Sequence, residues 1–172
     1  MAEITNSTLL KINTGITLKS DASLVIVKTE WNAAFVDKLE KGCRKTLREH
    51  GIKKIKTLTV PGAVEIPFII RKYWDAHAGR PADAFIALGC VIRGGTPHFE
   101  YVCRSVTDGI TQLNLVLPVP VIFGVLTVEN EKQANERLGG KHGHKGEEAA
   151  LTAIKMIALA ESLNVKGERP AV

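Results

Sequence analysis

The residues most suited to chemistry lie in the segment GCVIRGGTPHFEYV, residues 89–102. A run of strand-forming residues stops there at two glycines, and Thr96, Pro97 and His98 follow immediately. Glycines let a backbone approach a ligand closely, while the free N–H groups and the dipole of a helix start favour an anion such as phosphate. A histidine beside that anion can transfer protons near neutral pH. The same segment also suits an ordinary strand-to-helix turn, with Thr96 as N-cap and Pro97 as the first helical residue.

Three other stretches also place functional side chains directly after an apolar, strand-like run. TEWN holds Trp31 and Asn32, VPGAVEIP holds Glu65, and TVENEKQANERLGGKHGHKG is rich in charged residues. Trp31 can stack on a flat ring, and the carboxylate of Glu65 can bind hydroxyl groups. Each residue also has a simpler interpretation: Trp31 as a core or interface aromatic, Glu65 as a helix-start carboxylate, and His98 as a surface histidine.

The sequence holds none of the common cofactor or metal motifs. It has no Gly-x-x-x-x-Gly-Lys-Ser/Thr loop and no Gly-x-Gly-x-x-Gly after the first strand, which argues against ATP and NAD. The stretch GGKHGHKG, residues 139–146, contains two lysines and two histidines, but their spacing fits no standard zinc site. We therefore expect no ATP, NAD or metal site.

Four apolar runs alternate with amphipathic stretches along the chain. Phe35, Leu39, Cys43 and Leu47 recur every four residues, as on one face of a helix, and Gly51 follows as a helix end. This alternation predicts a parallel sheet covered by helices on both faces, with ligands beyond the carboxyl ends of the strands. The predicted strands are 24–28, 55–60, 83–92 and 120–128; the later helices are 97–114, 130–138 and 146–163, the last with Ala149, Ala153, Met156, Ile157 and Ala160 inward.

Composition limits the class of protein. The 172 residues suit one domain, and a hydrophobic content of 45% allows a packed core. The formal charge of +5 is dispersed, because KLEKGCRKTLREHGIKKIK interleaves glutamates with its lysines, so we expect no nucleic-acid surface. Cys43, Cys90 and Cys103 lack metal-ligand spacing and indicate a reducing, cytoplasmic compartment. The N-terminus lacks a signal-peptide pattern, and the longest apolar stretch, 116–128, is short and interrupted by prolines, so we expect no membrane association.

Four motifs, VPGAVEIP, ALGCVIRGGTPHFEYV, PVIFGVLTVEN and ANERLGGKHGHKGEEAA, resemble those of the 6,7-dimethyl-8-ribityllumazine synthase family and stand in the same order. The resemblance extends from Leu24 to about Leu163. It implies that residues 1–172 form a single-domain, three-layer α/β/α sandwich with a four-stranded, mainly parallel, flavodoxin-like sheet. Residues 1–22 are then expected to dock on a neighbouring subunit.

The resemblance also implies a reaction, the penultimate step of riboflavin biosynthesis. The family condenses 5-amino-6-(D-ribitylamino)uracil with 3,4-dihydroxy-2-butanone 4-phosphate to 6,7-dimethyl-8-ribityllumazine, releasing phosphate and water. It uses no cofactor and no metal.

Roles for individual residues follow from the same resemblance. His98 would transfer protons, and Gly95 and Thr96 would hold the phosphate together with Arg137 of a neighbouring subunit. The implied contacts to the ribitylaminouracil are Trp31, Asn32, Ala63, Val64, Glu65, Cys90, Val91, Ile92, Phe123 and Lys145. Trp31 stands where the family often has Phe, and Gly95 where it often has Ala, Glu or Ser. Neither departure removes ring stacking or backbone donation to phosphate.

The family forms pentamers, and some members pack twelve pentamers into an icosahedral shell. The resemblance therefore implies a homopentamer with sites between adjacent subunits, closed by Phe123 and Lys145 from the neighbour. The short GGKHGHKG loop favours the 60-subunit shell, and riboflavin synthase is a candidate partner. Two rival interpretations are a flavodoxin-like module that binds a flavin or nucleotide without turnover, and a shell protein that has lost catalysis. His98 and Arg137 favour an enzyme, because a binding module needs neither.

Overall fold

A four-stranded parallel sheet forms the centre of the computed structural model, which describes residues 21–77 and 82–165. The strands are β1 (Ser23–Thr29), β2 (Lys54–Val60), β3 (Ala84–Ile92) and β4 (Val121–Val128). They lie in the order β2-β1-β3-β4, and every neighbouring pair is parallel. The predicted α/β, flavodoxin-like fold is therefore confirmed.

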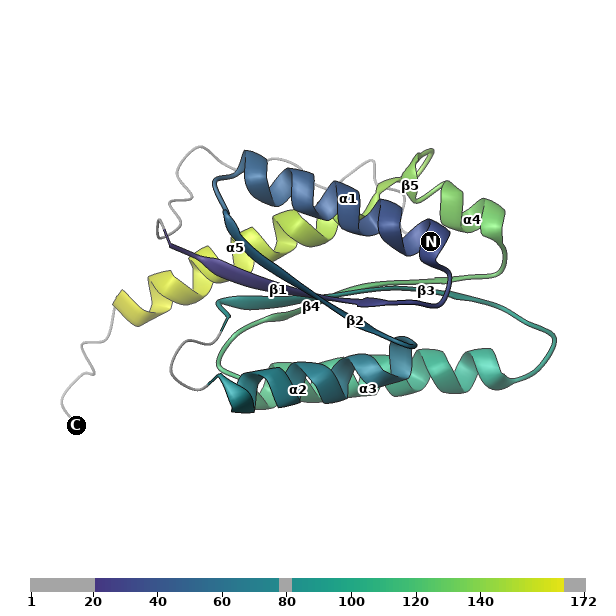
Figure 1. The fold of residues 1–172 in the computed structure, drawn as a ribbon, viewed down its shortest axis with the longest axis horizontal. Helices are drawn as coiled ribbons and strands as arrows, with labels where there is room; N and C mark the ends of the chain where they lie inside the picture. Colours follow the sequence, from purple (N-terminus) through teal and green to yellow (C-terminus); the bar gives the residue numbers. More distant parts are fainter. Residues whose placement is uncertain (1–20, 78–81, 166–172) are drawn as a thin grey trace.

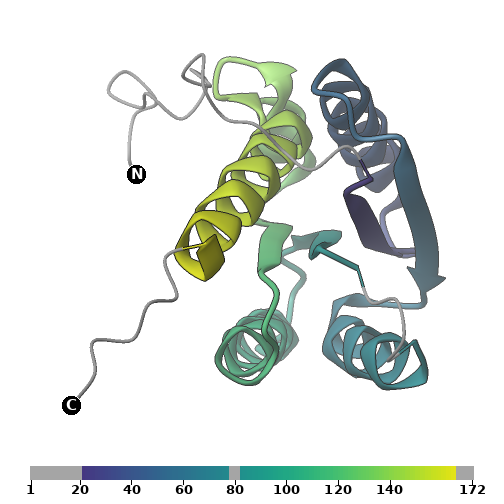
Figure 2. The same cartoon turned by 90° about the vertical axis from the view of Figure 1, so that its left-hand side faces the viewer.

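Two layers of helices cover the sheet, one on each face (Figures 1 and 2). On one face α1 (Ala33–Glu49) packs against α5 (Lys145–Val165). On the other face α2 (Ile66–Ala76) packs against α3 (His98–Val116). Both faces of β1 and β3 are buried as a result, which explains why their sequences are nearly continuous apolar runs.

Alternate residues of the central strands enter two separate cores. Leu24 and Ile26 pack on the α1/α5 side, whereas Val25, Val27 and Phe85 pack on the α2/α3 side. Because successive side chains point to opposite faces of a sheet, one apolar run supplies both cores. Burying each such side chain contributes about 1.5–3 kcal/mol, so the helices are held firmly against the sheet.

The two edge strands are more exposed than the central pair. In β2 the side chains of Lys54 and Lys56 are exposed, and lysines on an edge oppose the addition of further strands. At the start of β4, the Asn114 side chain donates a hydrogen bond to the Val121 carbonyl (2.8 Å) and accepts one from the Val121 N–H (2.9 Å). Helix α3 thereby satisfies part of the β4 edge.

The strand order reverses between β1 and β3, because the chain proceeds from β1 to β2 on one side and from β3 to β4 on the other. In parallel sheets, ligands bind in the crevice at the carboxyl ends where such a reversal occurs. These carboxyl ends point toward the right-hand side of Figure 1. There the 3₁₀ helix η3 (Ala63–Glu65) follows β2, α3 begins after β3, and α4 (Glu131–Asn135) follows β4. The functional stretches of the sequence are thus gathered at one rim.

The start of α3 differs by one residue from the prediction. The helix begins at His98, Pro97 occupies the N-cap position, and no side chain caps this helix end. The prediction of Thr96 as N-cap is therefore wrong. Pro97 has the φ of a helix (−61°), but its ψ of −1° is that of a turn, so the regular helix begins one residue later.

The segment 130–138 is not one helix, in contrast to the prediction. α4 ends at Asn135, and an antiparallel hairpin of β5 (Leu138–Gly140) and β6 (Gly143–His144) follows. Gly139 and Gly143 have φ of +102° and +72°, values that favour glycine, so the glycines form the hairpin.

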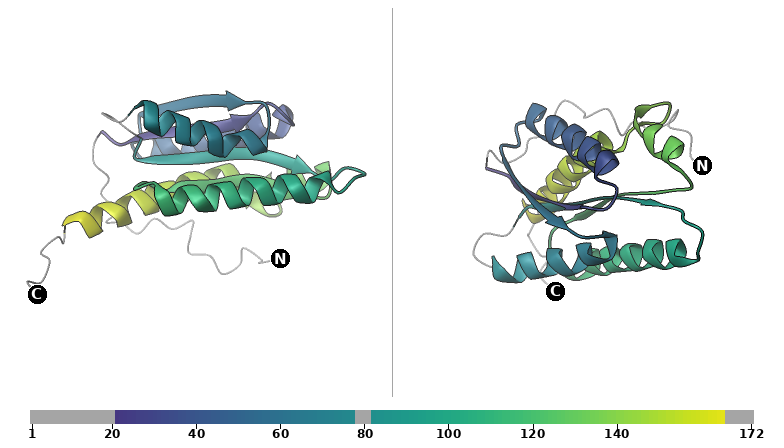
Figure 3. Two further views of the ribbon diagram at one scale, coloured as in Figure 1. Left: turned by 90° about the horizontal axis from the view of Figure 1, so that it is seen from below. Right: turned by 45° about the vertical axis from the view of Figure 1, so that its right-hand side comes forward.

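Two residues of α5 are also less buried than predicted. Met156 is 40% exposed and Ala160 is half-buried, whereas both were expected to face inward. Met156 lines an open cavity beside the edge strand β4, and no further layer formed by residues 21–77 and 82–165 covers it. The C-terminal half of α5 projects beyond the sheet (Figures 1 and 3), where Leu159 and Leu163 are exposed.

The remaining sequence predictions concern the N-terminus and the membrane. Residues 1–22, predicted to dock on a neighbour, lie outside the described residues apart from Asp21 and Ala22. Within residues 21–77 and 82–165, no helix is both long and apolar enough to cross a membrane.

Candidate active site

Trp31 stands at the end of β1 with its indole largely in solvent. Two backbone hydrogen bonds continue the pairing with β2, from Glu30 N–H to the Val60 carbonyl (2.8 Å) and from Trp31 N–H to the Pro61 carbonyl (3.2 Å). The backbone is therefore fixed while the side chain remains 73% exposed. An exposed, anchored indole is suited to stacking on a flat ring.

Asn32 turns the chain from β1 into α1. It has φ of +59° and ψ of +38°, a left-handed conformation that Asn tolerates better than most residues. Its Nδ2 donates a hydrogen bond to the Cys90 carbonyl at the end of β3 (2.8 Å). What the structure shows is a bridge across the crevice between β1 and β3.

Glu65 lies on the same rim as the indole. Its Oε2 accepts a hydrogen bond from the Gly62 N–H (2.9 Å), which orients the carboxylate. A Cβ on Gly62 would lie 3.0 Å from that oxygen and 4.0 Å from Trp31 Cδ1, so the residues are close neighbours. Beside them Ala63 is buried and Val64 is 43% exposed. A carboxylate has about four acceptor positions, so Glu65 keeps capacity for hydroxyl groups.

The end of β3 forms an apolar floor next to these groups. Cys90 is buried, and Val91 and Ile92 are half-buried. Burial raises the pKa of the Cys90 thiol to about 11, so the thiol stays neutral at physiological pH and is a poor nucleophile. Cys90 therefore acts as a packed apolar side chain of this floor. Cys43, Cys90 and Cys103 form no disulfide in this structure.

The loop after β3 carries the glycine pair into the first turn of α3. A Cβ on Gly94 or Gly95 would have no atom of the described chain within 4 Å, and neither glycine has a positive φ. Internal packing does not require glycine there, so a side chain at position 95 could be accommodated. Thr96 and His98 are both exposed. His98 thus lies beside an accessible backbone at the start of a long helix, where an anion is favoured.

Arg137 and Lys145 flank the β5–β6 hairpin. The Lys145 N–H donates to the Arg137 carbonyl (2.9 Å), which joins the two residues through the backbone. Arg137 Nη1 donates to the Gln133 carbonyl (2.9 Å), and Lys145 Nζ donates to both Glu148 oxygens (2.9 and 2.7 Å). The hairpin therefore places two basic side chains close together, and the charge of Lys145 is paired with Glu148.

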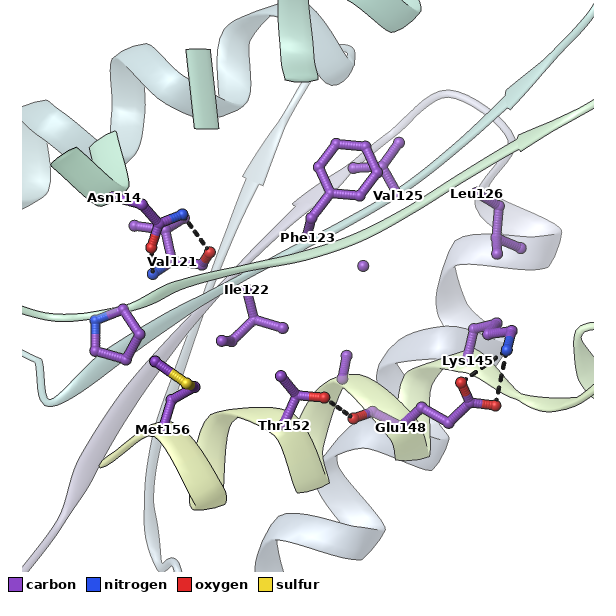
Figure 4. A pocket seen from close by; sticks show the side chains of 13 residues that line it. Asn114, Val121, Ile122, Phe123, Val125, Leu126, Lys145, Glu148, Thr152 and Met156 are labelled. Atoms are coloured by element: carbon purple, nitrogen blue, oxygen red, sulfur yellow. Dashed lines mark hydrogen bonds and ion pairs between the residues drawn. The ribbon is translucent and has the colours of Figure 1, made fainter. Parts of the chain in front are cut away.

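Phe123 and Lys145 line a cavity of about 490 Å³ between β4, α3 and α5. Phe123 projects from one side of β4, while Lys145, Thr152 and Met156 lie on the other side (Figure 4). Phe123 is 42% exposed. Neither Trp31 nor His98 lines this cavity. The predicted site residues therefore form two groups in one chain: one at the carboxyl ends of β1, β2 and β3, and one around the edge strand β4.

The sequence model of the 6,7-dimethyl-8-ribityllumazine synthase family matches residues 21–161. The chain belongs to this family.

Curated relatives agree with the family match. The chain is 50% identical over 141 residues to a 6,7-dimethyl-8-ribityllumazine synthase of Porphyromonas gingivalis, covering 81% of this chain and 86% of the relative. It is 48% identical over 141 residues to that of Bacteroides fragilis, with 81% and 96% covered, and 46% identical over 140 residues to that of Parabacteroides distasonis, with 80% and 86% covered. As a family member, the chain is an enzyme, a transferase of riboflavin biosynthesis that acts on small molecules.

The two histidines of the GGKHGHKG stretch make contacts that hold the β5–β6 hairpin in place. A Cβ on Gly42 of α1 would lie 2.3 Å from the His144 ring, so the ring packs directly on the helix backbone. His142 Nε2 lies 3.9 Å from Glu136 Oε2. Within residues 21–77 and 82–165, no three His, Cys, Asp or Glu residues are grouped so that they could hold a metal ion.

One residue of this rim was missed by the sequence analysis. Arg93 donates hydrogen bonds to Glu129 and Glu100, and its guanidinium lies over the Phe99 ring, with Cζ 4.2 Å from the ring centroid. The available signal was an arginine directly before the two glycines, followed seven residues later by an acidic residue in the first helical turn. Its partner Glu129 could not be identified, because the two residues are 36 positions apart.

Proposed function

We propose that the chain condenses 5-amino-6-(D-ribitylamino)uracil with 3,4-dihydroxy-2-butanone 4-phosphate to 6,7-dimethyl-8-ribityllumazine, releasing phosphate and water. The proposal rests chiefly on one observation: an exposed indole, an oriented carboxylate and an exposed histidine occupy the carboxyl ends of β1, β2 and β3. A flat ring, a polyhydroxyl chain and a reacting carbonyl need these three kinds of group.

The pyrimidine substrate would bind on the β1–β3 part of the rim. Trp31 stacks on its ring, and such aromatic contacts are worth about 0.5–1.5 kcal/mol beyond buried area. Cys90, Val91 and Ile92 provide the apolar floor. Glu65 accepts hydrogen bonds from the ribityl hydroxyls, and Ala63 and Val64 contribute backbone groups. Asn32 supports this pocket through its hydrogen bond to Cys90.

The phosphate of the second substrate would bind at the start of α3. Gly95 and Thr96 donate backbone N–H groups there, and the helix dipole favours the negative charge. Arg137 of a neighbouring subunit supplies a guanidinium, which matches the geometry of a phosphate. The ketone carbon then lies near His98.

His98 would move the protons of the reaction. Attack of the substrate amine on the ketone gives an imine and releases water, and elimination then releases the phosphate. The resulting enol rotates, and attack of the second nitrogen closes the ring with loss of another water. Each step transfers protons, for which one positioned histidine contributes about 10²–10⁴-fold. Holding the two substrates in register supplies much of the remaining rate.

The complete site would lie between two subunits. Phe123 and Lys145 line a cavity separate from Trp31 and His98, so a second copy is needed to join the two groups. We therefore propose a homopentamer, with residues 1–22 docked on a neighbour. The hairpin of GGKHGHKG is short, which supports the 60-subunit shell. We place the enzyme in the cytoplasm, with riboflavin synthase as a partner.

A direct assay tests the reaction. The purified protein is mixed with both substrates, and the lumazine is followed by absorption and fluorescence above the spontaneous rate. Binding of the pyrimidine without turnover would instead support the binding-module interpretation. Native mass spectrometry and electron microscopy distinguish a pentamer from the shell.

A further inference from the structure

We propose that Arg93 is a positioning residue that holds residues 94–96 and His98 in place by fastening the start of α3 to the end of β4. This inference rests on the proposed function. It assigns to Arg93 the role of holding the phosphate-binding loop, a role that the sequence motifs do not indicate.

The Arg93 side chain joins three partners through one planar group. Its Nε donates to Glu129 Oε2 just beyond β4 (2.6 Å), and its Nη1 donates to Glu100 in the first turn of α3. The guanidinium also lies over the ring of Phe99, the second residue of that helix. These contacts are directional, so together they restrict the orientation of the guanidinium even though both ion pairs are exposed.

The backbone of Arg93 is fixed as well. Its N–H donates to the Val128 carbonyl (2.9 Å), one residue beyond the β3–β4 ladder. In contrast, Gly94 and Gly95 have open space where a Cβ would stand. The position of the glycines therefore depends on what holds the two ends of the loop. Arg93 fastens the first end through its backbone and the second end through its side chain.

The surroundings of Arg93 argue for positioning and against direct binding of phosphate. Hydrogen bonds to Glu100 and Glu129 raise the pKa of Arg93, and the hydrogen bond from Arg93 lowers the pKa of Glu100. The guanidinium charge is thus already matched by two carboxylates. Without Arg93, those carboxylates would face a bound phosphate and repel it. The cation that balances the phosphate must then come from elsewhere, which agrees with Arg137 of a neighbour.

Exposed ion pairs contribute little to global stability, so the expected effect is local. Three variants separate the possible roles. Arg93→Lys keeps the charge but cannot form the same planar fork. Glu129→Asp keeps the charge, but its shorter side chain no longer reaches the Arg93 guanidinium in the same geometry. Arg71→Ala is the matched control, because it breaks an exposed arginine–carboxylate pair, with Asp75, on α2.

The variants are compared as assembled protein by three measurements: affinity for inorganic phosphate, KM for each substrate, and amide exchange at residues 94–98. Both Arg93→Lys and Glu129→Asp should lower kcat/KM for the butanone phosphate by roughly 10- to 100-fold, as expected when reacting groups are displaced by about 1 Å. KM for the pyrimidine should change by less than about twofold. Phosphate affinity should fall and exchange at 94–98 should rise, with Arg71→Ala unchanged.

Two results would overturn the inference. Tighter phosphate binding in Glu129→Asp would show that a freed Arg93 is itself a phosphate ligand. Native behaviour of Arg93→Lys in all three measurements would show that charge alone is sufficient. If the unmodified protein makes no lumazine, the proposed function fails, while phosphate affinity and amide exchange still decide the role of Arg93.

Discussion

At the scale of single residues, His98 combines exposure with a fixed position. As the first residue of α3 it is anchored by the helix, and the neighbouring glycines leave its surroundings open to a ligand. The imidazole is therefore placed to exchange protons with a bound molecule. In the proposed reaction, His98 contributes only to proton transfer, and other residues align the substrates.

We expect His98→Ala to lower kcat by about 10²–10⁴-fold without abolishing turnover. The substrates remain stacked and held by phosphate contacts, so the condensation still proceeds above the rate in buffer. Lumazine formation by absorption measures the rate, and binding of inorganic phosphate verifies the intact pocket. Complete loss of turnover with normal phosphate binding would contradict this division between alignment and proton transfer.

Two substitutions of Asn32 separate what its backbone conformation and its side-chain hydrogen bond each contribute to the free energy of unfolding. Asn32→Gly keeps the left-handed φ but removes the hydrogen bond to Cys90, and should lower the free energy of unfolding by about 0.5–1.5 kcal/mol. Asn32→Ala adds an unfavourable φ and should lower it by about 1–3 kcal/mol more. Thermal unfolding at one protein concentration ranks the variants, because an assembly makes the midpoint concentration-dependent. Equal losses in both variants would argue that the φ of Asn32 carries no strain.

At the scale of elements, close contact between α1 and the β5–β6 hairpin positions Arg137 and Lys145. Gly42 lets the His144 ring lie against α1, and a Cβ on Gly146 would lie 2.1 Å from the Leu39 carbonyl oxygen. Both contacts are possible only without a side chain. The hairpin and the start of α5 are therefore fixed by glycines on two helices.

Gly42→Ala should lower the free energy of unfolding by about 1–3 kcal/mol, because the new methyl group overlaps the His144 ring. The sign should reverse in a His144→Ala background. With the ring removed, alanine is the better helix former by about 0.5–1 kcal/mol. Unfolding of the four proteins of this double-mutant cycle measures the coupling. An identical effect of Gly42→Ala in both backgrounds would disprove the direct contact.

A second element-level contact joins β1, α1 and β2 through Glu40. Burial raises the pKa of this carboxyl, but hydrogen bonds from Lys28 and Thr57 (2.8 Å each) and the charges of Lys28 and Arg44 outweigh burial, so the pKa lies below its usual 4.5. A carboxyl whose pKa is lower in the folded state stabilises the fold above its unfolded pKa. That stability is lost as the pH falls through the folded pKa.

Glu40→Gln should therefore destabilise the protein near neutral pH, and the difference from the unmodified protein should shrink below about pH 4.5. Urea unfolding between pH 3 and 7 measures the difference in free energy of unfolding between the two proteins. Glu49→Gln is the control, because its exposed pair with Lys45 is long at 3.8 Å and should matter little at any pH. A pH-independent difference for Glu40→Gln would mean that the lost stability is not electrostatic.

At the scale of the whole molecule, exposed apolar residues accumulate where a neighbour would contribute to the site. Phe123 on β4 and Met156 on α5 are exposed and line one open cavity, and Leu115 and Val116 are exposed at the end of α3. Large apolar side chains that remain exposed beside a cavity are typical of a surface that binds another protein chain. This surface supports the proposed assembly, in which Phe123 closes the site of an adjacent chain.

Mixing two variants of low activity tests whether the site is shared. His98→Ala and Arg137→Ala should each be slow, since each removes one side of every site. After dissociation and reassembly together, some interfaces combine an intact His98 with an intact Arg137 from the next chain, so activity should return. Native mass spectrometry confirms that mixed assemblies have formed. No recovery in such assemblies would place both residues in one chain's site.

The sequence by itself determined the order of elements and the position of the site rim. Apolar runs flanked by turns identify buried strands, and the parallel alternation brings their carboxyl ends together, so Trp31, Glu65 and His98 could be grouped without coordinates. Local patterns were less reliable where glycines control the backbone. The β5–β6 hairpin was missed because it depends on positive φ at Gly139 and Gly143, and a sequence pattern does not show which glycines adopt positive φ.

Only the tertiary structure decided contacts between residues far apart in the chain. Neither the Arg93–Glu129 pair nor the Asn32–Cys90 bridge has a periodic signature, because both depend on which strand ends become neighbours after folding. The sequence also does not show that Phe123 and Trp31 lie at different places on the folded chain. Chemistry-bearing residue types are local properties of a sequence, whereas their alignment follows from long-range packing of the sheet and its two helical layers.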